Sequence, residues 1–233
     1  MNTLSKAIHD SIYPVRASSW PALFDCAYKW EGDILEQIFK ASGLRALLGT
    51  AIHAGTAIFD HGRIEHDGSG IDDSCDKFVQ TLSYPDFEVD YGVDDMSLAE
   101  AEYIGLQLVT KYCRDISPRY EFAAVEMETR PLDIDCGGGI VIRLTGKMDR
   151  SRLVKGQRRQ RVADLKSGAV AVQNGVAKTR GHGPQIGTYC LLHEHTTCQT
   201  VDDTSEIIGL KTKGKPEVAT GEIEGAKRLM TGD

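Results

Sequence analysis

The segment "RRQRVADLKSG", residues 158–168, decides the fold because it has the pattern of a β-strand that runs into a turn. Successive side chains of a strand point to opposite faces, so Asp164 and Lys166 share one face while Ala163 and Leu165 share the other. An acid and an amine on one strand face form either a surface ion pair, which contributes about 0.5 kcal/mol, or part of a reactive site.

Further short strands are predicted on both sides of this one. The segments 120–134 and 138–154 alternate apolar and polar residues, and glycines at 137–139 and at 156 mark turns, which is typical of an antiparallel meander. The late segment 205–223 has the pattern of a closing strand or hairpin.

Helices are predicted before and after these strands. The segments 18–39, 43–62, 97–116 and 183–196 carry apolar residues at helical spacing, several with capping residues in front. The polar, Gly- and Asp-rich stretch 61–95 predicts loops with at most a short helix.

This order of elements predicts an α/β fold in which helices flank a mixed central sheet. We expect a single domain over residues 1–233, with a mainly helical part at 1–117 and a sheet-centred part at 118–233.

Composition and charge restrict the class of protein. The chain is 41% hydrophobic and 26% charged, as in globular proteins, and it contains no apolar run of the ~18 residues that a membrane helix needs. The N-terminus lacks the apolar core of a secretory signal, so we expect a cytoplasmic protein without membrane contact.

The positive charge is concentrated in one part of this acidic chain. Residues 141–182 carry eleven Lys and Arg against Asp149 and Asp164, a net charge of +9 in a chain whose total is −7. Such a segment is typical of a polyanion footprint, and it includes the candidate DNA contacts Arg150, Lys178 and Arg180. The alternative is a basic hairpin tip that only faces water.

Asp149 is a second acid close to the strand of Asp164. It follows the segment "IVIRLTGKM", and a hairpin would bring it near Asp164. Two converging carboxylates repel each other unless a cation lies between them, and Mg²⁺ typically uses one or two carboxylates. The pattern predicts a metal site, with Lys166 beside it to orient water or neutralise phosphate charge.

These residues resemble the PD-(D/E)XK nuclease superfamily, specifically its RecB-like exonuclease branch. "GKMDR" followed by "ADLKSG" resembles the core motif, "LLGTAIHAG" resembles the upstream helix, and "QIGTY" resembles the Q-x-x-x-Y helix of the branch. "ASSWPALFDCAYKW" resembles its opening segment. The likeness extends in family order from about residue 17 to residue 195, although Met148 replaces the proline of the core motif.

The resemblance implies a restriction-endonuclease-like core and a metal-dependent DNA nuclease, most often an exonuclease in recombination, repair or phage DNA metabolism. It implies that His53, Asp149, Asp164 and the Leu165 carbonyl hold Mg²⁺ or Mn²⁺, that Lys166 is catalytic together with the two acids, and that DNA is the substrate. A helicase or a single-strand annealing protein is implied as a partner by family only. The alternative is a non-catalytic DNA-binding or scaffold module on the same fold.

Several positions keep two interpretations. An additional acid is expected from Glu126 or Glu128, with Glu126 favoured slightly. Gln185 and Tyr189 share one helix face and are candidate DNA contacts, although that face could instead pack inward.

Cysteines give no pattern for a cluster. Branch members with an iron–sulfur cluster have one early and three late cysteines, but here only Cys190 and Cys198 follow "QIGTY", so no such cluster is expected.

Overall fold

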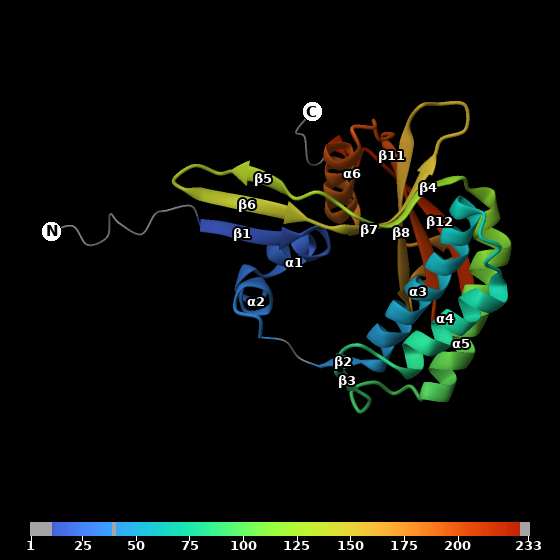
Figure 1. The fold of residues 1–233 in the computed structure, drawn as a ribbon. Coiled ribbons are helices and arrows are strands. Elements are labelled where there is room, and N and C mark those ends of the chain that lie inside the picture. Colours follow the sequence, from blue (N-terminus) through green and yellow to red (C-terminus); the bar gives the residue numbers. More distant parts are fainter. Residues whose placement is uncertain (1–10, 39–40, 229–233) are drawn as a thin grey trace.

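The computed structural model describes residues 11–38 and 41–228 and confirms the mixed α/β architecture. Figure 1 shows a central sheet with α3, α4 and α5 on one face and α6 on the other, and a smaller sheet that extends away from it. No described helix is both long enough and apolar enough to cross a bilayer.

Five of the described α-helices lie in the first half of the chain, and α6 lies in the second half. The helical elements are α1 (Trp20–Asp25), α2 (Ala27–Trp30), α3 (Leu44–Glu65), α4 (Ile71–Ser83), α5 (Leu98–Lys111) and α6 (Gly183–Thr197), with 3₁₀ turns at Ala17–Ser19 and Ser117–Arg119 and π turns at Glu31–Leu35 and Tyr112–Ile116.

The strands gather in two larger sheets and two small pairs. They are β1 (Ser11–Arg16), β2 (Ser42–Gly43), β3 (Val89–Asp90), β4 (Phe122–Glu128), β5 (Leu132–Asp135), β6 (Ile140–Thr145), β7 (Lys147–Leu153), β8 (Gln160–Gly168), β9 (Val172–Gln173), β10 (Val176–Ala177), β11 (Thr204–Lys211) and β12 (Glu217–Glu224).

The five-stranded sheet has the order β12-β11-β8-β7-β4. All its neighbours are antiparallel except β8 and β11, which are parallel and are connected through α6. A parallel pair needs such a crossover because a tight turn can join only antiparallel strands. The predicted meander over β4 to β8 is confirmed, and the closing hairpin is β11 with β12.

One long antiparallel ribbon joins the two larger sheets. Its central-sheet half is β4 with β7, and its other half is β5 with β6, which form a three-stranded sheet with β1. The ribbon bends at Thr129 and Gly146, where the Thr129 amide and hydroxyl both donate to the Gly146 carbonyl, at 2.9 and 2.8 Å. A Cβ at Gly146 would lie 2.9 Å from Cε1 of Tyr189, so the bend packs directly on α6.

The central sheet buries apolar residues on both faces. On the face of α3 to α5, Ala163 and Leu165 of β8 pack with helix residues such as Ile52 and Phe78. On the other face, Met148 and Val162 pack against α6 and against Trp30 of the N-terminal part. Strand β8 is therefore central and covered on both faces, which explains why Val162, Ala163 and Leu165 are all apolar.

Three expectations about the first hundred residues were wrong or incomplete. The single helix predicted over 18–39 is broken at Cys26, whose backbone is extended (φ −153°, ψ 96°), so that Trp30 turns into the core. The stretch 61–95 contains the 13-residue helix α4.

Strand β1 was not predicted, because Pro14 interrupts its pattern. The strand is possible because β1 is at the edge of the three-stranded sheet, where proline is tolerated.

Candidate active site

The central sheet opens between β7 and β8, at the position of the two predicted acids. Backbone pairing of these strands extends from the hairpin tip only as far as Arg150 opposite Ala163. Beyond that point a side chain takes the place of a backbone acceptor. Oδ2 of Asp149 accepts a hydrogen bond of 2.7 Å from the Leu165 amide. The gap between the strands is thus filled by an acidic side chain.

Three side chains from three elements converge at this opening. His53 of α3 places Nδ1 3.4 Å from Oδ1 of Asp149, and Glu126 of β4 completes the set, with one donor atom from each residue within 4.8 Å of the others. Glu126 has a left-handed backbone (φ 49°), which is rare for a residue with a side chain. The structure thus brings together His53 and Asp149, which were predicted from sequence, and favours Glu126 over Glu128, which lies exposed at the end of β4.

Asp164 and Lys166 share a strand face, as expected, and contact each other beside this set. Lys166 Nζ lies 2.8 Å from Asp164 Oδ2 in an ion pair, and no other group of the described residues hydrogen-bonds this buried oxygen. The Asp164 side chain is only 2% exposed. A buried carboxylate needs compensating partners, and a bound cation would supply one in addition to Lys166.

The two aspartates have opposite pKa shifts. Burial, and then the charge of Asp149, raise the pKa of Asp164 to about 7. Burial alone would raise the pKa of Asp149 as well, but His53, Arg150 and the Leu165 amide together lower it to about 2. Burial is the largest single influence on His53 and opposes its charging. The charge and hydrogen bond of Asp149, together with the charge of Glu126, outweigh burial and raise the pKa of the imidazole.

This donor set fits a divalent cation. An imidazole nitrogen and carboxylate oxygens are usual ligands of Mg²⁺ or Mn²⁺. The repulsion between Asp149 and Asp164 and the burial of the Asp164 carboxylate are conditions that a bound cation would relieve. Both oxygens of Glu126 already contact cations, Oε1 with Arg150 at 3.1 Å and Oε2 with Lys147 at 2.9 Å.

Arg150 does not lie on the surface, which corrects its prediction as a DNA contact. Its side chain is fully buried, and Nε lies 2.6 Å from Oδ2 of the equally buried Asp60. Nη1 donates to Glu126 and to the Asp149 carbonyl, and Nη2 donates to Thr56. Arg150 therefore connects α3 to Glu126 and Asp149 of the candidate site through a fully buried side chain.

Sequence reasoning missed Asp60 and its partners. The Asp60 carboxylate also accepts hydrogen bonds of 2.5 Å from the hydroxyls of Tyr112 and Ser117. A signal was present, because Thr56 and Asp60 follow Ile52 at steps of four residues on the buried face of α3. Polar residues on an apolar stripe require partners inside the protein.

The remaining candidate residues differ in exposure. Gln185 and Tyr189 lie in α6 and are mostly buried, with Gln185 Nε2 donating to the Tyr189 hydroxyl at 3.4 Å. The helix face therefore packs inward, and a DNA contact by these two side chains stays a prediction. The Leu165 amide is engaged by Asp149, and the metal-ligand role of its carbonyl also stays a prediction.

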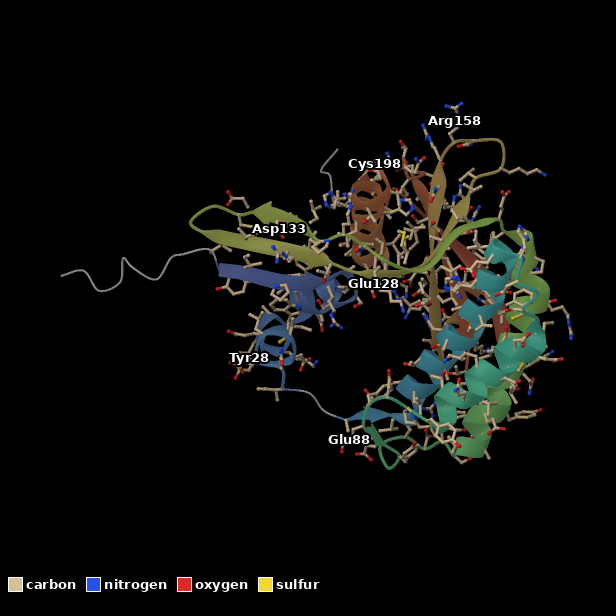
Figure 2. All side chains as sticks on the ribbon, in the orientation of Figure 1. Tyr28, Glu88, Glu128, Asp133, Arg158 and Cys198 are labelled. Carbon is tan, nitrogen blue, oxygen red and sulfur yellow. The ribbon has the colours of Figure 1, made fainter. Side chains whose placement is uncertain are left out.

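Six of the eleven basic residues of segment 141–182 form ion pairs with acids, five of them with acids outside the segment. Ion pairs hold Arg143 with Asp133, Lys147 with Glu126, Arg150 with Asp60, Arg152 with Glu206, Arg161 with Asp202 and Glu222, and Lys166 with Asp164. Within the described residues no ion pair involves Lys155, Arg158, Arg159, Lys178 or Arg180. Figure 2 shows Arg158 at the outer tip of the β7–β8 hairpin. The net charge of this segment therefore overstates its attraction for a polyanion.

Comparisons with known proteins concern the family and the fold of the chain. The family model described as the PD-(D/E)XK nuclease superfamily matches residues 17–229. Among solved structures, a candidate exonuclease from Eubacterium rectale is similar in fold, with a TM-score of 0.58 and 11% sequence identity, over 99% of this chain and 81% of that one. No curated protein matches the chain by sequence.

Proposed function

The chain belongs to the PD-(D/E)XK nuclease superfamily, and from this premise we propose that it is a metal-dependent deoxyribonuclease, specifically an exonuclease of DNA recombination, repair or phage DNA metabolism. The observation that carries the proposal is the convergence of His53, Glu126 and Asp149 beside the Asp164–Lys166 pair. These groups come from α3, β4, β7 and β8, so the fold as a whole assembles them.

His53, Asp149, Asp164 and the Leu165 carbonyl would hold one or two Mg²⁺ or Mn²⁺ ions. A bound divalent cation supplies charge that polarises a scissile phosphate and activates water for attack. Asp164 is suited to this position because its buried Oδ2 pairs only with Lys166 among the described residues. Glu126 would act as an additional acid whose orientation is fixed by Lys147 and Arg150.

Lys166 would place a positive charge at the edge of the site. Its ammonium lies on the same strand face as Asp164, 2.8 Å from it, and is partly exposed. In this position it can hydrogen-bond the attacking water and offset the negative charge that grows on the phosphate. Asp149 would keep the site open, since its bond to the Leu165 amide holds β7 and β8 apart.

DNA would be held mainly by cations that no acid neutralises. Lys178 and Arg180 precede α6, whose first residues include Gln185, and these groups together with Tyr189 would contact the backbone near the site. Contacts of this kind carry no sequence information and weaken as salt concentration rises. A helicase or single-strand annealing protein would deliver the DNA to such an enzyme.

The test compares cleavage of linear and covalently closed circular DNA in Mg²⁺ or Mn²⁺. The wild type is measured beside Asp164→Ala, Lys166→Ala and the control Asp133→Ala, which removes an exposed acid of β5. We expect degradation of the linear substrate by the wild type and the control, and loss of at least ~100-fold in rate in the two site variants.

Each other outcome changes a different part of the proposal. Cleavage of closed circles would replace the exonuclease with an endonuclease. DNA binding without cleavage by the wild type would identify a non-catalytic binding module. Equal activity of Asp164→Ala and the control would place the chemistry elsewhere. Calorimetric titration with Mn²⁺ gives an independent readout, since Asp149→Ala should bind the ion more weakly than Asp133→Ala.

A further inference from the structure

A polar cavity adjoins the candidate active site at the bend of the long ribbon. Its volume is about 360 Å³, within the range of pockets that bind small ligands. Figure 2 shows Glu128, one of its lining residues, where the ribbon passes between the two sheets. The lining consists of Arg16, Ser18, Glu128, Thr145, Gly146, Lys147 and Tyr189, and we call it the Arg16 pocket.

The Arg16 pocket is connected to the candidate active site by Lys147. The Lys147 ammonium lies 2.9 Å from Oε2 of Glu126, and Glu126 belongs to the converging set with His53 and Asp149. The hydrogen bond to Glu126 is the main influence that raises the pKa of Lys147, and the charge of nearby Asp149 adds to it. A ligand in the pocket would therefore lie next to the groups that would act on a phosphodiester.

The chemistry of the lining favours an anion with polar substituents. Arg16 is exposed at the end of β1 and forms no ion pair with any described residue, so its guanidinium is available for bidentate binding of a phosphate. Ser18 and Thr145 add hydroxyl groups, and Thr145 is the direct strand partner of Arg16.

Tyr189 adds an aromatic residue with a hydroxyl donor. Its hydroxyl oxygen accepts from Gln185, which leaves the proton free to donate. Burial raises the pKa of this phenol, so the proton is retained.

Backbone contacts hold the walls of this cavity in place beside the candidate site. Arg16 is held by the pairing of β1 with β6, and its carbonyl accepts a hydrogen bond of 2.9 Å from the Ser19 hydroxyl. Gly146 lets the ribbon pass against α6, because any larger residue would meet Tyr189 and Leu192. Glu128 is the one acid in the lining, and it opposes an anionic ligand.

We propose that the Arg16 pocket binds the nucleotide next to the scissile phosphodiester, with Arg16 and Lys147 on its phosphate. The identification of the ligand as part of a DNA substrate rests on the proposed nuclease function. The binding of a nucleotide to the pocket can be measured without cleavage. The class of ligand is a nucleoside monophosphate unit, recognised by charge and hydroxyl donors and not by base identity. Arg16 is then a residue that fixes the position of the strand relative to the acids.

The test is a calorimetric titration with thymidine 5′-monophosphate in EDTA, with thymidine as the probe that lacks the phosphate. We expect saturable binding of the monophosphate to the wild type, about tenfold or more weaker binding to Arg16→Ala, and no measurable binding of thymidine. Glu128→Gln should bind the monophosphate more tightly than the wild type, because it removes a negative charge from the pocket.

Arg143→Ala is the matched control, because it removes an arginine of the same sheet that is paired with Asp133. The proposal is overturned if this variant loses as much affinity as Arg16→Ala, if Arg16→Ala binds like the wild type, if thymidine binds as well as its monophosphate, or if the wild type shows no saturable binding. If cleavage is absent while this binding pattern holds, the nuclease proposal fails and the pocket remains.

Discussion

Replacing Arg150 with methionine should destabilise the protein by about 3–5 kcal/mol, the usual cost of breaking a buried ion pair by removing one partner. The guanidinium is fully buried and contacts Asp60, Glu126, Thr56 and the Asp149 carbonyl. Without it, Asp60 keeps only the hydroxyls of Tyr112 and Ser117 in a dry environment. For a chain of this size the loss corresponds to a decrease in Tm of roughly 6–20 °C.

The measurement is urea unfolding followed by circular dichroism, with Arg143→Met as the control. Arg143 also pairs with an aspartate on the neighbouring strand, but the two side chains of that pair are 40% and 46% exposed, so its loss should cost at most about 0.5 kcal/mol. The double variant Arg150→Met/Asp60→Asn should be more stable than the sum of its single variants predicts, because no unpaired charge remains. A cost below about 1 kcal/mol for Arg150→Met, or strict additivity in the double variant, would refute the reasoning.

Three further predictions follow from packing and charge. Gly105→Ala should destabilise the protein by about 1–3 kcal/mol or more in thermal unfolding, since a Cβ would lie 2.0 Å from Cζ of the buried Phe78. Gly32→Ala should be near neutral, because its Cβ would meet only Cδ1 of Ile38 at an ordinary contact distance of 4.0 Å. Burial lowers the pKa of His193 below its ordinary value of 6.5. As the pH falls below about 6.5, the unfolded chain therefore binds a proton at this histidine before the folded chain does, and the free energy of unfolding should decrease. His193→Gln should show a smaller decrease. If Lys178 contacts DNA phosphate, Lys178→Ala should reduce the slope of log K against log salt by about 1 in a binding titration, while Arg161→Ala, which removes a cation already paired with two acids, should change the slope less.

The fold was predictable where local pattern and tertiary environment agree. Strand β8 and helix α5 have strong periodicity and clear ends, and their predicted positions match the structure to within a few residues. Strand β1 could not be predicted from its own residues, since it depends on pairing with β6, which lies more than a hundred residues away. The break at Cys26 likewise depends on the burial of Trp30 in a distant core.

The candidate site was predictable for residues that carry a motif and not for those that support it. His53, Asp149, Asp164 and Lys166 were found through order and spacing. Arg150 was assigned to the surface because a charged residue beside an acid gives no sign of burial. Its partner Asp60 is 90 positions away, so only three-dimensional structure shows that the two charges neutralise each other.

The bend in the long ribbon has a mechanical consequence. Strand β4 continues into β5, and β6 continues into β7, with only a few residues between them. The two sheets are therefore joined by continuous strands, and the Thr129–Gly146 hydrogen bonds fix the bend between them. A displacement of the outer sheet would therefore be transmitted along covalently continuous strands towards Glu126 on β4 and Asp149 on β7.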